Sequence, residues 1–446
     1  MRQLRRLLPR RGRAVPGQAS LFRQPGKLPQ ACGPERLLHR LGGLPHLRHD
    51  RRPSLRARRR CRGGRGGCAR LSVLATPVTL RFHARLAAHP FRQRRGHSGG
   101  PNLTTRKALF KGRDWLTTQE WSGAEIETLL DVSADLKRKF KRRLPHRFLP
   151  DQTIFLMFFD KSTRTRNSFE AGITQLGGHA HFLTADAMQV SHGESPKDTG
   201  IILSRYGHAI AIRHDLIPGE GNSYMREVAK WADAPVINMQ CDVDHPCQTL
   251  ADLMTIREKL GSNLRGRKLA VSWAYAPSYA KPLSVPQGLI MLMTRFGMDV
   301  TLAHPREYPL MPETLEAARE NARRAGVRFE LTDNMDDAFR DADVVIPKSW
   351  GCLDTMGAAP AESLRIARQH QDWRCDAARM KLARAGALYM HPLPADRGNE
   401  VTDDVIDGPQ SVVYDEAENR LHTAKAIMAL TMADAEIEYE PGDWGA

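Results

Sequence analysis

Hydroxyl and guanidinium side chains alternate in one short string, Ser162-Thr163-Arg164-Thr165-Arg166, which follows the apolar run 152–159 (QTIFLMFF). A helix that begins near Arg166 would present free N–H groups and the positive end of its dipole here, with the hydroxyls capping that end. Such N–H groups and an adjacent guanidinium together suit a tetrahedral oxyanion. A capped helix with two solvated arginines is the simpler alternative, but the strand-loop-helix setting favours a phosphate-like site.

Three further stretches place polar side chains next to predicted strands or helices. They are Arg213 in AIAIRH, His245 in His-Pro-Cys-Gln, and the string 415–422 (DEAENRLH), which contains Arg420. Taken singly, His245 could be a hydrogen-bonded loop histidine, and Arg420 could lie along a helix with its head in water. The sequence has no signature of a P-loop, a dinucleotide-binding turn, a zinc protease or a serine-hydrolase elbow. We therefore expect anion chemistry with no metal and no cofactor.

Short apolar runs alternate with amphipathic stretches after about residue 101, which predicts an α/β fold. The predicted strands are 152–159, 179–184, 209–213, 235–239, 267–274, 299–303, 343–347 and 387–391. The predicted helices are 166–176, 198–206, 223–232, 248–260, 286–296, 312–325 and 416–432. Strands separated by helices of this length form right-handed crossovers, so we predict two doubly wound parallel sheets with a boundary near 248–260. Ligands then collect at the carboxyl ends of the strands.

The positive charge of the chain is concentrated at one end. The 446 residues carry 67 Lys and Arg against 50 Asp and Glu, a net charge of +17. Residues 1–100 hold 25 of the basic groups and two acids, which leaves 42 basic and 48 acidic groups in the rest, a balance of −6. A uniformly basic surface for nucleic acid is therefore excluded. The Arg-rich segment 1–100 has no periodicity, and we predict a disordered extension: an inert or untranslated tail, a targeting peptide, or an RNA-binding arm.

The remaining length suits two domains of a soluble protein. The longest apolar candidate in the basic segment, 71–80, is shorter than the roughly 20 residues that a membrane helix needs, and Pro77 interrupts it. The seven cysteines form no C-x-x-C pair, and their odd number indicates free thiols in a reducing compartment. A cytoplasmic location is expected.

The strings quoted above resemble motifs of the aspartate and ornithine carbamoyltransferase family. Ser162–Arg166, Arg213, His245–Gln248, His391-Pro392-Leu393-Pro394 and 415–422 occur in the family's order. The resemblance implies transfer of the carbamoyl group from carbamoyl phosphate to an amine. It also implies that residues 101–250, with helix 416–435, bind carbamoyl phosphate, and that 251–415 bind the second substrate.

The same resemblance implies a role for each matching residue. Arg164 and His245 would be catalytic, since they would donate hydrogen bonds to the carbonyl oxygen in the transition state. Gln248 would hold the carbamoyl NH2, and a neighbouring subunit of a homotrimer would lend Gln189, with His192 beside it, from the segment 188–197. The set implied for carbamoyl phosphate is Ser162, Thr163, Arg164, Thr165, Arg213, His245, Gln248, Arg420 and the neighbour's Gln189.

The second substrate is implied by a different part of the chain. Lys348-Ser349-Trp350 stands where ornithine enzymes carry an acid, and together with the proline-rich segment 282–286 it is similar to the knotted branch that contains N-acetylornithine and N-succinylornithine carbamoyltransferases. The resemblance thus implies a trefoil knot in the second domain and a substrate that presents a carboxylate or acyl group. The residues implied are Lys348, Ser349, Trp350, Pro392 and Leu393. A core position for Trp350 is the alternative.

Two other functions compete with this reading. One is an ornithine or aspartate carbamoyltransferase proper, which the string 415–422 and Pro392 respectively suggest. The other is an RNA-associated protein that acts through the Arg-rich segment 1–100. We expect carbamoyl phosphate and an amino-acid-like amine as partners, with neither membrane nor nucleic acid among them.

Overall fold

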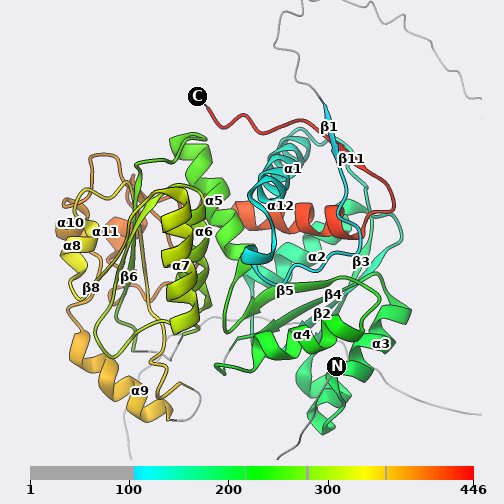
Figure 1. Ribbon diagram of the computed structural model, residues 1–446, viewed down its shortest axis with the longest axis horizontal. Coiled ribbons are helices and arrows are strands. Elements are labelled where there is room, and N and C mark those ends of the chain that lie inside the picture. The colour runs from blue at the N-terminus through cyan, green and yellow to red at the C-terminus, as the bar shows by residue number, and fades with distance from the viewer. Residues whose placement is uncertain (1–104, 216, 278–280, 357–358, 446) are drawn as a thin grey trace, which may run out of the picture. The chain divides into compact units, whose positions relative to one another are not determined.

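A computed structural model describes residues 105–215, 217–277, 281–356 and 359–445 (Figure 1). The basic segment 1–100, predicted to be disordered, lies outside the described residues. Within the described ranges, no helix is both long and apolar enough to cross a membrane. The cysteines described, Cys241, Cys247, Cys352 and Cys375, are buried free thiols.

The first sheet has four parallel strands in the order β3-β2-β4-β5. Their bounds are Thr153–Phe158 (β2), His179–Thr184 (β3), Ala209–His214 (β4) and Val236–Cys241 (β5). Apolar side chains run through the central strands because both faces of the sheet are covered. In Figure 1, helices α1 (Gly123–Lys141), α2 (Arg164–Leu176) and α12 (Val413–Met432) lie on one side of this sheet, and α3 (Pro196–Tyr206) and α4 (Gly221–Trp231) lie on the other.

The second sheet has five parallel strands in the order β10-β9-β6-β7-β8. Their bounds are Lys268–Trp273 (β6), Asp299–Ala303 (β7), Phe329–Thr332 (β8), Val344–Lys348 (β9) and Leu388–Tyr389 (β10). Helices α6 (Ser284–Arg295) and α7 (Pro312–Ala325) pack together on one side. The shorter helices are α8 (Met335–Phe339), α9 (Pro360–Ala367), α10 (Ala377–Met380) and α11 (Asp403–Ile406). The prediction of two parallel sheets is confirmed.

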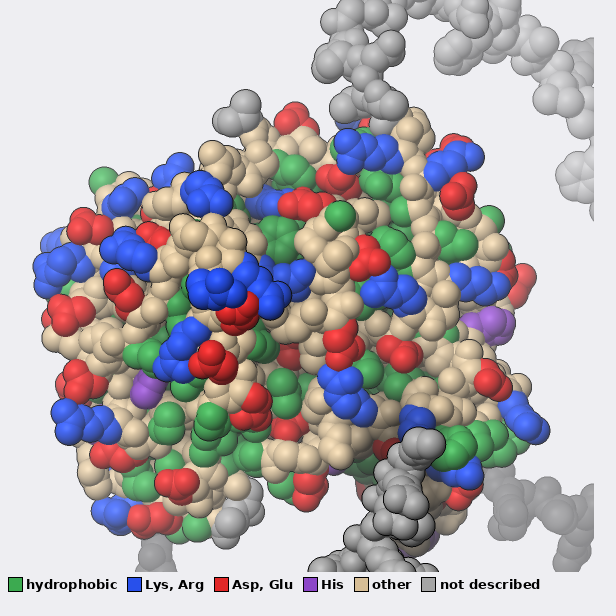
Figure 2. Space-filling model, in the orientation of Figure 1, with side chains coloured by type: hydrophobic (Ala, Val, Ile, Leu, Met, Phe, Trp, Pro, Cys, Tyr) green, Lys and Arg blue, Asp and Glu red, His purple; other side chains and the backbone are tan. Residues whose placement is uncertain are grey.

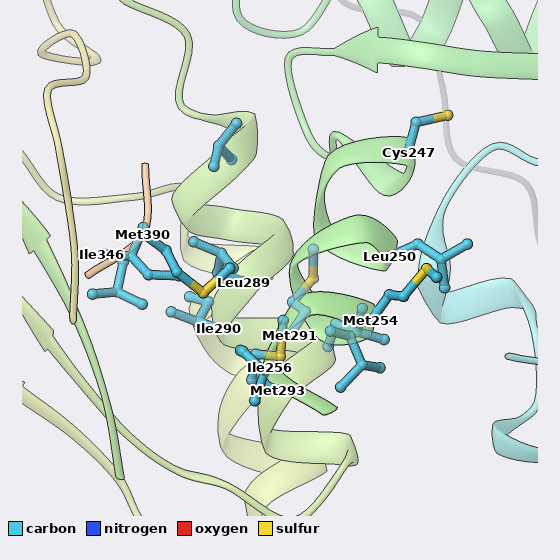
Figure 3. Close-up of a cluster of buried hydrophobic side chains, with 14 of the residues drawn as sticks. Cys247, Leu250, Met254, Ile256, Leu289, Ile290, Met291, Met293, Ile346 and Met390 are labelled. Atoms are coloured by element: carbon cyan, nitrogen blue, oxygen red, sulfur yellow. The ribbon is translucent and has the colours of Figure 1, made fainter. Parts of the chain in front are cut away.

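Helix α5 (Pro246–Leu260) connects the two sheets and packs against α6. Figure 3 shows Ile256 of α5 close to Met291 and Met293 of α6, and Leu250 and Met254 on the side of α5 that faces away from α6. All five side chains belong to one continuous apolar cluster that extends into both sheets. The core therefore fixes the start of α5, where His245 and Gln248 lie, relative to the second sheet.

Helix α12 returns the end of the chain to the first sheet, where it packs against α1, α2 and α5 (Figure 1). Its residues from Thr423 to Met432 are all buried, which is the pattern of a helix covered on every side. After α12, strand β11 (Ile437–Tyr439) pairs in antiparallel fashion with β1 (Arg106–Ala108). This return brings Arg420 of α12 next to α2.

Several elements were not predicted from the sequence or have other bounds than predicted. Helix α1 and strand β8 were not predicted, and the strand predicted at 387–391 has only two residues. The proline-rich segment 282–286 overlaps the start of α6, which begins at Ser284. Local patterns set element types better than element bounds, which depend on tertiary contacts.

Lys and Arg side chains are interspersed with Asp and Glu on the face of the described chain that Figure 2 shows. Several of these charges form exposed pairs, such as Arg323 with Glu320 and Arg328 with Asp299. Mixed charge of this kind agrees with the balance of −6 counted after residue 100.

Candidate active site

The alternating string lies at the junction of β2 and α2, as its setting predicted. Helix α2 begins at Arg164, two residues earlier than expected, so Arg164 and Thr165 lie in its first turn. The expectation that hydroxyls cap this helix is wrong for Thr163, because it occupies the N-cap position without a side-chain hydrogen bond to the helix. Without that cap, the hydroxyl does not compete with an incoming anion for the first N–H groups.

A cavity of about 280 Å³ opens in front of this helix end, where β2, β4 and β9 reach their carboxyl ends. It collects residues from both sheets and from α12. Of the residues predicted for the site, those that line the cavity are Ser162, Thr163, Arg164, Thr165, Arg213, His245, Gln248, Lys348, Pro392, Leu393 and Arg420.

Positive charge dominates this cavity. Six Lys and Arg side chains line it, and Asp160 is the one acid among the described lining residues. Burial, followed by the charges of Arg420 and Arg213, lowers the pKa of His245 well below its usual value. His245 is therefore neutral at pH 7, so it can donate a hydrogen bond from one ring nitrogen without adding charge.

Arg213 is aimed by an irregularity in its strand. The register between β4 and β5 shifts between Ile212 and Arg213, and such a bulge redirects a side chain. The guanidinium Nη2 then donates to Asp215 Oδ2 at 2.9 Å. Burial raises the pKa of Asp215 to about 6 although Arg213 opposes the shift, so the Asp215 carboxyl is mostly ionised at pH 7.

Arg420 crosses from α12 to meet both α2 and α5. Its Nη2 donates to Thr165 Oγ1 at 2.9 Å, and its Nη1 donates to Gln248 Oε1. Burial lowers the pKa of Arg420 to about 10, which still leaves the guanidinium charged at pH 7. Three elements far apart in the sequence thus share one buried cation.

The Arg164 side chain extends from α2 to the part of the cavity that is lined by the segment after β10. Its Nη2 donates to the main-chain oxygen of Leu393, whose own N–H donates to His391 Nδ1 at 2.9 Å. Leu393 has a φ of 49°, which is strained for a branched side chain and is held by these two contacts.

Lys348 ends β9 and enters the cavity from the second sheet. Its Nζ donates to the carbonyl oxygens of Ser349 at 2.8 Å and Pro282 at 3.4 Å. Burial, reinforced by the nearby charge of Lys281, lowers the pKa of Lys348 to about 7. A small change in surroundings, such as a bound anion, is therefore enough to set its charge.

Glu400 holds the segments around Lys348 together, and the sequence reasoning missed it. Its carboxylate accepts hydrogen bonds from Lys281 Nζ and from the N–H groups of Ser349 and Asp396, each at 2.6 Å. Glu400 is fully buried, yet its pKa is lowered because His391 and Lys281 stabilise the charge against the cost of burial. Lys281 itself lines the cavity.

Some predicted residues lie outside this cavity. Trp350 is 1% exposed and donates from Nε1 to the carbonyl oxygen of Tyr308, so it is a core residue beside the site and forms no wall of this cavity. Ser349 contributes its main chain to Glu400 instead. Gln189 and His192 lie on an exposed turn that contributes no lining residue to this cavity.

Two family models cover most of the described chain. Residues 113–258 match the carbamoyl-phosphate binding domain of aspartate/ornithine carbamoyltransferases, and residues 283–431 match the Asp/Orn binding domain. The chain belongs to the aspartate/ornithine carbamoyltransferase family. It is a carbamoyltransferase that uses carbamoyl phosphate and an amino-acid substrate.

Curated relatives of this carbamoyltransferase include one whose name states no second substrate and one that is named an ornithine enzyme. The chain is 41% identical over 340 residues to "Putative carbamoyltransferase YgeW" of Escherichia coli strain K12, covering 68% of this chain and 86% of that one. It is 38% identical over 327 residues to the ornithine carbamoyltransferase of Halalkalibacterium halodurans, covering 73% and 97%.

Solved structures include both ornithine and acetylornithine enzymes. The ornithine carbamoyltransferase from Pyrococcus furiosus is similar with a TM-score of 0.66 at 39% identity, covering 73% of this chain and 98% of that one. An acetylornithine transcarbamylase complexed with acetylcitrulline has a TM-score of 0.66 at 33% identity, covering 72% and 100%.

No group of three or more His, Cys, Asp or Glu side chains that could hold a metal ion occurs in the part of the chain that the structure describes. Besides Glu400 and Lys281, the sequence reasoning missed Gln240, which lines the cavity and donates from Nε2 to Ser284 Oγ at 3.0 Å. Gln240 sits at the end of a buried strand, where only its polar type in an apolar run could have marked it.

Proposed function

We propose that this carbamoyltransferase acts on an amine that carries a carboxylate, with an N-acylated diamino acid as the first candidate. The observation that carries the proposal is the lining of the cavity, which has six Lys and Arg side chains and, among its described residues, one acid, and in which Lys348 stands where an acid would serve a cationic amino acid. Carbamoyl phosphate neutralises part of this charge, and a carboxylate on the second substrate neutralises more.

The residues that line the cavity have separate tasks in this proposal. The first turn of α2, together with Arg213 and Arg420, holds the phosphate, since N–H groups and guanidinium groups both favour a tetrahedral dianion. Arg164 and neutral His245 donate to the carbonyl oxygen, where negative charge develops in the transition state. Gln248 accepts a hydrogen bond from the carbamoyl NH2, and the main chains of Pro392 and Leu393 face the amine.

The proposed chemistry needs no covalent enzyme intermediate. The neutral amine attacks the carbonyl carbon, the new C–N bond forms, and the C–O bond to phosphate breaks. The proton lost by the amine passes to the leaving phosphate, so the products are a ureido compound and hydrogen phosphate. Placement of charge rather than a general base then accounts for the rate.

The finer architecture also belongs to the proposal. Residues 101–250 with the C-terminal helix form the carbamoyl-phosphate domain, and 251–415 form the second domain. A trefoil knot of the acetylornithine type is supported by the contact of Lys348 with Pro282 and by the hydrogen bond from the Gly351 N–H to the Lys281 oxygen at 2.8 Å. The exposed position of Gln189 and His192 supports a homotrimer in which both side chains reach a neighbour's site, and a cytoplasmic location stays part of the proposal.

An ornithine carbamoyltransferase is the second candidate, because several relatives of 38–40% identity carry that name. A panel of amines incubated with carbamoyl phosphate and the full chain separates the two. We expect ureido product from N-acetylornithine, N-succinylornithine or another carboxylate-bearing acylated amine, and slow turnover of ornithine. Efficient turnover of free ornithine, together with no turnover of any acylated amine, would exclude the first candidate.

A further inference from the structure

Behind Gln248, away from the cavity, two carboxyl side chains lie in the protein interior. Asp252 belongs to the second turn of α5, and Glu416 belongs to the first turn of α12. Each side chain is 1% exposed, and the two carboxyl groups hydrogen-bond to one another. None of the chemistry described above uses this pair.

Both carboxyl groups accept a hydrogen bond from the same amide. Gln248 Nε2 donates to Asp252 Oδ1 at 2.7 Å and to Glu416 Oε1 at 2.8 Å. On its other side, Gln248 Oε1 accepts from Arg420 Nη1. If the amide were reversed, its oxygen would face the carboxyl oxygens, which accept hydrogen bonds, and its NH2 group would face the Arg420 guanidinium, which only donates. The neighbours therefore dictate which end of the amide faces the cavity.

Two ionised carboxylates cannot coexist here at low cost. The charged or titratable groups that face the pair are Arg420 from α12, Tyr389 from β10 and His391 from the following loop, which contributes its main-chain N–H to Glu416 Oε2 at 2.9 Å. One guanidinium balances one carboxylate, and a buried second charge would stay uncompensated. Burial raises the pKa of Asp252 to about 7 and raises that of Glu416 well above its usual value.

We propose that Asp252 and Glu416 hold a single proton between them and act as positioning residues that fix the Gln248 amide with its oxygen toward Arg420 and the carbamoyl group. The proposal rests on the proposed function, because it concerns how that site recognises the carbamoyl NH2. Loss of the shared proton places two charges side by side, drives the carboxylates apart and releases the amide. Recognition of the carboxamide is then lost at alkaline pH.

The test compares two probes whose binding does not depend on the unidentified amine. Phosphonoacetamide carries a phosphonate and a carboxamide, with a methylene in place of the bridging oxygen of carbamoyl phosphate, and methylphosphonate lacks the carboxamide. The ratio of their dissociation constants, measured by calorimetry on the full chain and corrected for the ionisation of each phosphonate at each pH, reports the carboxamide contact. We expect the wild type to prefer phosphonoacetamide by about tenfold at pH 6.5, the effect of one well-placed hydrogen bond, and to lose that preference by pH 9.

Variants of the pair distinguish a role in positioning the Gln248 amide from a role in packing alone. Asp252→Asn replaces the shared proton with an amide N–H to Glu416 and keeps an oxygen for Gln248, so it should hold the full preference at both pH values. The double variant Asp252→Ala with Glu416→Ala should lose the preference at pH 6.5. Asp415→Asn is the matched control, because it removes one charge from the same helix at an exposed residue paired with Lys259.

The outcomes are distinct. An equal decline with pH in the wild type and in Asp252→Asn would show that another group titrates and would overturn the proposal. A full preference in the double alanine variant would overturn it as well, and if that variant does not fold, the pH comparison still decides. Failure of the wild type to bind either probe would remove the proposed roles of the cavity residues in holding carbamoyl phosphate, and this inference with them.

Discussion

Arg164, in the first turn of α2, donates a hydrogen bond to the main-chain oxygen of Leu393, which follows β10 in the second sheet. One guanidinium therefore links the first turn of α2, which we propose to bind phosphate, to the loop that we propose to face the second substrate. In the proposed mechanism, the same guanidinium also donates to the carbonyl oxygen of carbamoyl phosphate.

Substitution of Arg164 tests this dual position. Arg164→Ala should lower kcat by on the order of 10²–10³, the usual effect of removing one donor to a developing oxyanion. Arg166→Ala is the matched control, since Arg166 pairs with Glu170 at 3.0 Å and lies over Phe182 outside the cavity. Steady-state kinetics with carbamoyl phosphate check this, and equal losses in the two variants would show that only the local helix matters.

Lys348 should make binding of the second substrate depend on pH. Its lowered pKa of about 7 means that the ammonium form is present below pH 7 in the free enzyme and is lost as the pH rises. An N-acyl amino acid that lacks the reacting amine should therefore inhibit less at pH 8.5 than at pH 6. In Lys348→Met the inhibition constant should be weaker and nearly independent of pH; an unchanged pH profile in that variant would remove Lys348 from the substrate site.

Glu400 should contribute to stability through its charge. Glu400→Gln removes the partner of Lys281 and leaves a buried cation with Asp396 at 3.4 Å as its remaining acid, which should lower the free energy of unfolding by about 3–5 kcal/mol. Because the folded-state pKa of Glu400 is lowered, its contribution is present at neutral pH and is lost as the pH falls. Urea unfolding at pH 7 measures the effect, with the exposed Glu362→Gln as control.

Asp252 should have the opposite dependence on pH. Its pKa is raised from 3.8 to about 7, so the folded state binds more protons than the unfolded state between these values. Stability therefore falls as the pH rises through that window, and Asp252→Asn should not show this fall. The unfolding free energy of Asp252→Asn minus that of the wild type should therefore increase from pH 5 to pH 8. A difference that stays constant would mean that Asp252 is ionised throughout.

Much of the phosphate half of the site could be predicted from sequence, because its residues lie in short strings at strand ends. Ser162–Thr165 follow the buried strand β2 and Arg213 lies near the end of β4, and the parallel topology brings those ends to one edge of the sheet. Arg420 required the family resemblance, since nothing local shows that α12 returns to α2.

The remaining residues are defined by tertiary contacts that no local pattern records. Glu400 lies in an ordinary polar stretch and Asp252 in an apolar run, and only the fold places them against Lys281 and Gln248. For Trp350 the sequence suggested a residue of the substrate site, because it lies two residues after Lys348. Its side chain instead turns into the core. Alternation along the chain near a strand end does not determine which side chain faces the cavity.

Transfer of the carbamoyl carbon is the most direct test of the account. Carbamoyl phosphate labelled with ¹³C at the carbonyl is incubated with the full chain and each amine of the panel, and the product is followed by ¹³C NMR. The account predicts a ureido signal that depends on an acylated, carboxylate-bearing amine, is much weaker with free ornithine and is nearly abolished in Arg164→Ala. Decay of carbamoyl phosphate at the enzyme-free rate with every amine would contradict it.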